Sequence, residues 1–193
     1  MKNNDRLLIL FILLFTGNYA AFAQTEQQSV LLGGNIGVSY AKQAKQYNFS
    51  IDINPKFGYF IVKNLMLGAE LSIGIGSNNE TKDGKNRFMV FGAFSPVARY
   101  YFMKEKVRPF IHAQFGYISI TAIHDGDISN LDGIGGGGGL GVDYFMTKNV
   151  ALECLFRYHG AKFSGLPLQS QFVIGLGLQY YFHPRIKQEM LPQ

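Results

Sequence analysis

Seven charged residues of this chain lie in segments where apolar residues alternate with small or polar ones, and all seven fall on the small or polar side of that alternation. The seven are Asp52, Lys56, Glu70, Arg99, Asp143, Glu153 and Arg157. If that side lines a confined interior, the charges form either a path for ions or a network of pairs that fills the space. We favour the network, and because an unpaired buried charge is strongly unfavourable, we expect Arg99 and Arg157 to lie against carboxylates.

Histidine and serine residues are the next candidates for chemistry. His112, His124, His159 and His183 lie in different segments and lack the spacing of a metal site. A serine nucleophile would need a histidine beside it, and the candidate pair is His159 with Ser164, five residues apart. Neither arrangement is favoured, so the sequence predicts no metal ligand and no catalytic residue.

Two further stretches resemble ligand-binding loops only in part. The segment 125–129 begins like a calcium loop, but the glycine required at the sixth place is Asn130, and Gly136 stands at the twelfth instead of glutamate. The segment 133–141 contains G-x-G-x-x-G, yet no helical pattern follows it, so we expect these glycines to make room in a strand. The sequence therefore predicts no cofactor.

Eight predicted strands position all of these residues. Each shows period-two alternation, in which one face is apolar or aromatic and the other is small or polar. The expected strands are residues 29–40, 47–61, 65–76, 87–102, 110–121, 134–146, 149–159 and 171–182. A tilted membrane strand needs about 9–11 residues, and bacterial membrane barrels have an even number of strands. The predicted fold is an all-β, eight-stranded, antiparallel up-and-down transmembrane β-barrel.

The predicted connections alternate in length. Tight turns are expected at 62–64, 103–106 and 147–149, and longer polar loops at 77–86, 122–133 and 161–169, with a shorter one at 41–46. Membrane barrels place short turns on the periplasmic side and longer loops outside. Four tyrosines, Tyr59, Tyr100, Tyr144 and Tyr180, end alternate strands at the short-turn side. Tyrosine favours the boundary between hydrocarbon and water, so these four predict an aromatic girdle.

The volume of the two faces decides which one points outward. An eight-stranded barrel has room only for its own interior side chains, and the aromatic face would overfill it. Glycine supports this orientation: 13 glycines fall on the slim face, and only Gly34, Gly92, Gly136 and Gly138 fall on the apolar face. We therefore expect the bulky face to meet lipid. A soluble secreted barrel is the structural alternative.

The N-terminal segment predicts export. A basic start, an apolar run from Leu7 to Phe15 and the ending Ala21-Phe22-Ala23 are the three parts of a signal peptide, expected to be cleaved at 1–23. Nine apolar residues are too few for a spanning anchor. The expected mature chain, a barrel at 24–182 with a short tail at 183–193, carries 16 Lys and Arg against 12 Asp and Glu. This scattered surplus predicts no nucleic-acid binding, and a lone cysteine, Cys154, allows no internal disulfide.

These features together resemble the small outer-membrane β-barrel family, which includes OmpX-like, OmpA-barrel-like and porin-family barrels. The resemblance covers residues 29–182 and rests on the signal peptide, the eight alternating strands and the ending Gly177-x-x-Tyr180-x-Phe182. The run Pro96-x-x-Arg99-Tyr100-Tyr101-Phe102, followed by Pro109-Phe110, is similar to the Bacteroidetes-type branch. The resemblance implies the outer membrane of a Gram-negative bacterium, with outer-membrane lipid as surroundings. It also implies that Gly177, Tyr180 and Phe182 are a signal for the barrel-assembly machinery.

Three functional hypotheses follow from this interpretation. The favoured one is a non-enzymatic barrel whose external loops serve surface interaction or envelope integrity, with an external ligand that the sequence does not identify. The alternatives are a porin-like passive channel for small solutes and a lipid-modifying barrel enzyme. A narrow, filled lumen argues against conduction.

Overall fold

The computed structural model describes residues 25–43, 46–80, 86–103, 105–124 and 127–182. The predicted signal peptide at 1–23 and the predicted tail at 183–193 lie outside these residues. Among the described residues, no helix is long and apolar enough to cross a membrane.

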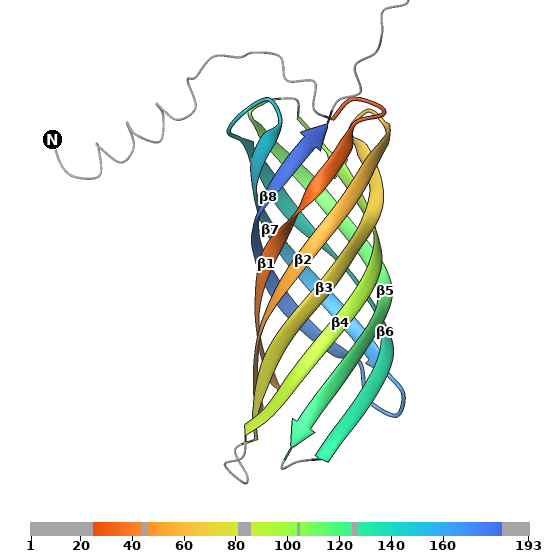
Figure 1. Cartoon of the computed structure of the whole chain (residues 1–193), viewed down its shortest axis with the longest axis vertical. Coiled ribbons are helices and arrows are strands. Elements are labelled where there is room, and N and C mark those ends of the chain that lie inside the picture. The colour runs from red at the N-terminus through yellow and green to blue at the C-terminus, as the bar shows by residue number, and fades with distance from the viewer. Residues whose placement is uncertain (1–24, 44–45, 81–85, 104, 125–126, 183–193) are drawn as a thin grey trace, which may run out of the picture.

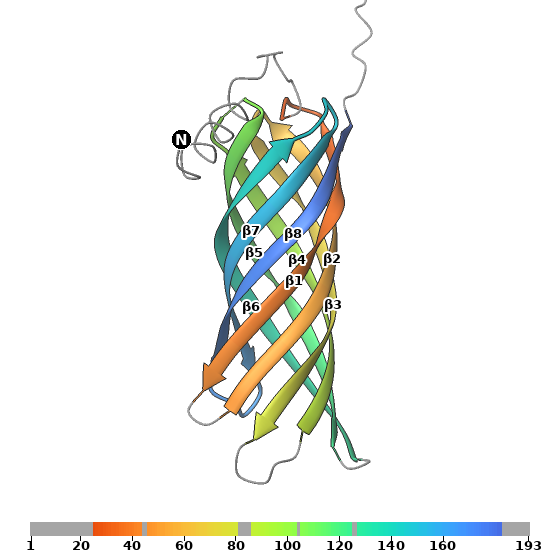
Figure 2. The ribbon, with the colours of Figure 1, turned by 90° about the vertical axis from the view of Figure 1, so that its left-hand side faces the viewer.

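Eight antiparallel strands close into one barrel in chain order, with β8 paired to β1 (Figures 1 and 2). The predicted eight-stranded up-and-down barrel is therefore confirmed. The strands are β1 (Val30–Gln43), β2 (Gln46–Val62), β3 (Leu65–Glu80), β4 (Asn86–Tyr101), β5 (Val107–His124), β6 (Asp127–Phe145), β7 (Val150–Phe163) and β8 (Gln169–Phe182). Closure pairs the backbone groups of each strand on both sides, which a hydrocarbon environment requires.

The two ends of the barrel differ. At the turn end, uppermost in Figure 1, β1 begins, β8 ends, and short turns join β2 to β3 and β6 to β7. Asn64 turns the chain between β2 and β3 with a φ of 66°, a left-handed conformation that asparagine tolerates better than most residues. The loop end lies opposite, where β1 joins β2, β3 joins β4, β5 joins β6 and β7 joins β8.

The faces of the strands follow the predicted alternation. Along β2, from Ile51 to Phe60, exposed and buried residues alternate without interruption. Glycine lets neighbouring strands approach on the inside: a Cβ at Gly139 would lie 2.2 Å from the carbonyl oxygen of Phe156. The bulky residues face outward and the slim face lines the lumen, as the volume of the two faces predicts.

The strands extend further toward the loop end than the sequence predicts. The prediction of a loop at 122–133 is wrong, because β5 continues to His124 and β6 starts at Asp127, with residues of the two strands paired throughout. The predicted loops at 77–86 and 161–169 are also shortened by strand residues at both ends. Beyond the apolar band, polar residues such as Asn130 and Asp132 stand at outward positions, so the alternation fades while the backbone pairing between strands continues.

Candidate functional site: a plugged lumen with an outer cavity

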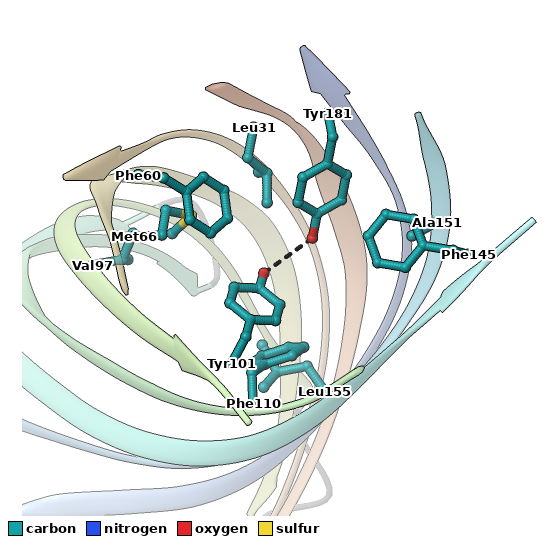
Figure 3. Packing of buried hydrophobic residues seen from close by; sticks show 10 residues of the cluster. All are labelled: Leu31, Phe60, Met66, Val97, Tyr101, Phe110, Phe145, Ala151, Leu155 and Tyr181. Carbon is teal, nitrogen blue, oxygen red and sulfur yellow. Dashed lines mark hydrogen bonds between the residues drawn. The ribbon is translucent and has the colours of Figure 1, made fainter. Parts of the chain in front are cut away.

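Ten buried residues fill the lumen at the turn end. They contact one another as one cluster, the aromatic plug, in which no residue is more than 4% exposed: Leu31, Phe60, Met66, Val97, Tyr101, Phe110, Phe145, Ala151, Leu155 and Tyr181 (Figure 3). The ring of Tyr101 lies 5.7 Å from that of Phe60 and 5.2 Å from that of Phe110, and the Phe145 ring lies 4.9 Å from that of Tyr181. Tilted rings at these distances are favourable aromatic pairs that close-pack the interior.

The hydroxyls of the aromatic plug bind a buried carboxylate. The Tyr101 and Tyr181 oxygens lie 3.1 Å apart, and both hydroxyls donate to Asp143, the Tyr101 hydroxyl at 3.2 Å. Asp143 therefore lies in the lumen and is bound by tyrosines.

The segment that precedes β1 closes the turn end of the barrel, on the far side of the aromatic plug from the loop end. Arg108 donates to the hydroxyl of Thr25 at 3.0 Å, and this hydroxyl donates to Asn64 at 2.8 Å. The Arg108 guanidinium lies 4.6 Å from the centre of the Phe145 ring. Arg108 and Thr25 are buried, so the turn end is sealed by polar contacts as well as by rings.

A continuous chain of ion pairs crosses the lumen next to the aromatic plug. Arg99 contacts Glu153 at 2.5 Å, Glu153 contacts Lys56 at 2.9 Å, Lys56 contacts Glu70 at 3.2 Å, and Glu70 contacts Arg157 at 2.5 Å. Asp52 ends the chain, with an oxygen 3.9 Å from Arg157. The ion-pair chain thus holds three cations and three carboxylates, and both Arg99 and Arg157 lie against carboxylates.

Neutral side chains complete the contacts of the ion-pair chain. Asn35 donates to Glu153 at 2.9 Å, and Arg99 donates through Nε to Nδ1 of His112 at 3.1 Å. Since Nδ1 accepts, His112 carries its proton on Nε2 and donates to Oε1 of Gln114 at 2.9 Å. The same Gln114 oxygen accepts from Arg157 at 2.9 Å. These contacts fix His112 as a neutral structural residue.

A cavity of about 540 Å³, the outer cavity, occupies the lumen between the ion-pair chain and the loop end. The side formed by β4 to β7 is mostly apolar, with Met89, Phe91, Ala93, Ile118, Ile120, Ala122, Leu131, Ala161 and Phe163, and it also includes the polar residues Ser95, Gln114, Ser129, Asn130 and His159. The facing side, from β8, β2 and β3, is mostly polar, with Ser50, Asp52, Asn54, Ser72, Gln169, Ser170 and Gln171, and it also includes Phe49, Gly76 and Val173. Arg157 lines the same cavity from β7.

The remaining predicted residues lie at the following positions. Tyr59, Tyr100, Tyr144 and Tyr180 all end strands at the turn end, where Tyr180 lies opposite Leu32 and Val150, and Tyr144 lies opposite Val107. Gly177 pairs with Asn35 at the seam between β8 and β1, and Phe182 is the last residue of β8. His159 lines the outer cavity, whereas Ser164 is exposed in the turn after β7. Within the described ranges, no group of three His, Cys, Asp or Glu residues could hold a metal ion.

The contacts of several site residues were not predicted from the sequence. Asn35, Asn54, His112 and Gln114 stand in the predicted inward register, so their position was available, but their hydrogen bonds were not. Tyr101 and Tyr181 were not predicted as site residues, although their inward register is the signal that they fill the lumen. Arg108 was missed because β5 begins three residues earlier than the predicted strand at 110.

A family model for the outer membrane protein beta-barrel domain matches residues 8–182. The chain belongs to this outer-membrane β-barrel family. It is a protein of the Gram-negative outer membrane, so the turn end is periplasmic and the loop end faces outward.

Solved structures of outer-membrane barrels share the fold. Neisserial surface protein A is 17% identical with a TM-score of 0.65, and the match covers 81% of this chain and 100% of that one. The outer membrane protein OprG from Pseudomonas aeruginosa is 15% identical with a TM-score of 0.58, over 83% and 98%. Ail, the attachment invasion locus protein of Yersinia pestis, is 15% identical with a TM-score of 0.52, over 81% and 99%. The search of curated proteins finds no match.

The height of this outer-membrane barrel exceeds the lipid layer. Outward residues of β6 are apolar or glycine from Tyr144 to Ile134, a rise of about 25 Å for a strand tilted by about 40°. The next outward residue is Asp132, which is hydrogen-bonded to the hydroxyls of Ser119 and Tyr117. A charge on this face marks the boundary of the hydrocarbon, and the hairpin of β5 and β6 continues about 15 Å beyond it.

Proposed function

We propose that this protein acts by binding at the outer surface of the cell, without conducting solutes and without catalysing a reaction. The observation that supports this function most directly is the asymmetry of the lumen. The aromatic plug fills the periplasmic end, the ion-pair chain lies next to it on the outer side, and the outer cavity extends from there toward the outside.

Buried charges that are paired with one another favour a structural role over a conducting one. An ion that entered the lumen would have to displace contacts of 2.5 to 3.2 Å between Arg99, Glu153, Lys56 and Glu70. It would then meet the aromatic plug, in which no residue is more than 4% exposed. Separating a buried charge from its partner is strongly unfavourable, so we expect the barrier to permeation to be high.

The hairpin of β5 and β6 supports a surface role. It carries outward Ser119, Thr121, Asn130 and Asp132 beyond the apolar band, in a region where the barrel meets water instead of lipid. A paired hairpin presents these groups at fixed spacing, which is suited to recognition by a partner outside the cell.

Export and assembly belong to the same proposal. Cleavage of residues 1–23 would release the barrel, and Gly177, Tyr180 and Phe182 would be recognised by the barrel-assembly machinery. Tyr59, Tyr100, Tyr144 and Tyr180 would then anchor the periplasmic boundary of the membrane. The mass of the protein purified from outer membranes tests the cleavage site directly.

Planar-bilayer recording tests whether the barrel is closed. The purified protein should give no sustained conductance steps, and vesicles that contain it should swell in arabinose no faster than empty vesicles. Sustained steps would overturn the proposed function and favour a channel.

Labelling of intact cells tests the orientation. In a Cys154→Ser background, a membrane-impermeant maleimide should label Ser164→Cys on intact cells, because Ser164 is exposed at the loop end. The same reagent should label Thr147→Cys, in the turn between β6 and β7, only after the cells are lysed. The opposite pattern would contradict an outward-facing cavity.

A further inference from the structure

The outer cavity is mostly apolar on one side and mostly polar on the other. The wall from β4 to β7 presents apolar side chains such as Phe91, Ile118 and Phe163, while the facing wall presents Ser50, Asn54 and Gln171. Its volume of about 540 Å³ lies within the range of small-molecule sites. A ligand that is complementary to both walls must itself be amphipathic.

Two residues that line the cavity each have one buried polar atom without a hydrogen-bond partner among the described residues. These atoms are Nε of Arg157, a residue that is 5% exposed, and Oδ1 of Asn54, a residue that is 1% exposed. The first is a donor and the second an acceptor, and both residues line the cavity. A buried polar group without a hydrogen bond is unfavourable, so a ligand hydroxyl that reaches these two atoms would gain hydrogen bonds there.

The ion-pair chain lies at the inner end of the outer cavity, and its charge balance determines the kind of polar group that fits there. The ion-pair chain contains three cations and three carboxylates, and each of these side chains already has an opposite charge within 4 Å. A ligand that brought a carboxylate or an ammonium group would leave a net charge in this buried region. A hydroxyl is uncharged and both donates and accepts one hydrogen bond, which matches the unpartnered donor and acceptor.

We propose that the outer cavity binds an uncharged amphipathic small molecule, with its apolar body against the β4–β7 wall and a hydroxyl at Arg157 and Asn54. This inference rests on the proposed function, because it gives the outward-facing cavity its ligand class. The barrel then acts as a receptor for neutral amphiphiles that arrive from outside.

The methionines of the chain provide a direct assay. Met89 lines the cavity, Met66 lies in the aromatic plug, and Met146 is exposed near the periplasmic boundary. The barrel, labelled with ¹³C-methyl methionine in phosphatidylcholine nanodiscs, is titrated with 1-decanol. The Met89 signal should shift and saturate, while the Met66 and Met146 signals stay in place. A parallel, unsaturable shift of Met89 and Met146 would mean partition into lipid and would overturn the inference.

Two further compounds test the polar end of the ligand. Decanoate at pH 8 has the same chain with a charge, and 1-decene lacks the hydroxyl. We expect each compound to bind in the outer cavity about tenfold more weakly than 1-decanol. Decanoate brings an unbalanced charge, and 1-decene leaves the two polar atoms without hydrogen bonds. Decanoate binding as tight as 1-decanol binding would overturn the assignment of an uncharged ligand.

A matched pair of variants of β4 locates the site. Ala93→Trp places an indole in the cavity and should abolish the saturable Met89 shift, while Ala98→Trp places it on the lipid face of the same strand and should leave the shift unchanged. Equal binding by both variants would overturn the location. If the barrel remains closed in planar bilayers but Met89 never responds, the ligand inference fails and the proposed function stands.

Discussion

Replacing Arg99 by methionine should destabilise the barrel by about 3–5 kcal/mol. Arg99 is 1% exposed, contacts both oxygens of Glu153 at 2.5 and 3.2 Å, and donates to His112 at 3.1 Å. Three charge-assisted hydrogen bonds, at about 1.5–3 kcal/mol each, would give a larger loss. Removing the guanidinium also removes its own desolvation penalty, and Glu153 keeps Lys56 and Asn35, which brings the expected loss down to this range.

Urea titration in lipid vesicles measures this loss. The chain has no tryptophan, so the folded fraction is best followed by the faster migration of the unheated barrel on a detergent gel. The double variant Arg99→Met with Glu153→Gln removes one cation and one carboxylate together. It should therefore be less destabilised than the sum of the two single variants, by about 0.5–3 kcal/mol.

An exposed lysine provides the control. Lys148 lies in the turn between β6 and β7, and Lys148→Met should change the free energy of unfolding by less than about 0.5 kcal/mol. If Arg99→Met unfolded at the same urea concentration as this control, the ion-pair chain would not stabilise the lumen, and the argument from buried charge would be wrong.

Three further substitutions test the plug, the seam and the lipid face. Tyr181→Phe removes a hydroxyl that binds a buried carboxylate and should cost about 1–3 kcal/mol in the same urea assay. Gly177→Ala should lower the yield of folded barrel and should reduce its free energy of unfolding by about 1–3 kcal/mol, because the new Cβ would lie 2.0 Å from the carbonyl oxygen of Gly34. Gly92→Ala is the control and should be tolerated, because the nearest atom to its Cβ would be 3.9 Å away. Leu176→Arg places a charge on the 62%-exposed lipid face and should cost about 2–4 kcal/mol in vesicles, a loss that shrinks toward the membrane boundaries.

The sequence predicts the barrel well because both faces of its strands are constrained within the membrane. Lipid requires outward residues such as Leu176 to be apolar, and the narrow interior requires inward residues such as Gly177 to be small, so alternation records the fold directly. Where the barrel leaves the lipid, the outward constraint ends. Asp132 and Asn130 then stand at outward positions of a continuous strand, and a pattern-based reading takes them for a loop.

The contacts inside the lumen were predictable in kind but not in detail. Inward register alone places Arg99 and Glu153 in one confined space, and electrostatics requires them to find partners. Which carboxylate meets which cation depends on the stagger of strands that are far apart in sequence: Lys56 and Glu153 are 97 residues apart. The outer cavity was also beyond prediction, because it is defined by the space that side chains from seven strands leave empty.

The size of the inward side chains explains why the lumen is closed at one end and hollow at the other. At the periplasmic end, the ring of Phe60 lies 5.7 Å from that of Tyr101 and 6.1 Å from that of Tyr181, so large side chains fill the lumen. Toward the loop end, several inward positions of β2, β3 and β4 hold small residues, among them Ser50, Gly76 and Ala93, and the space that these residues leave contributes to the outer cavity. A conducting barrel would need small residues along its whole length. A dead-end cavity above a plug instead favours a ligand that enters and leaves on the same side, which is the behaviour of a receptor.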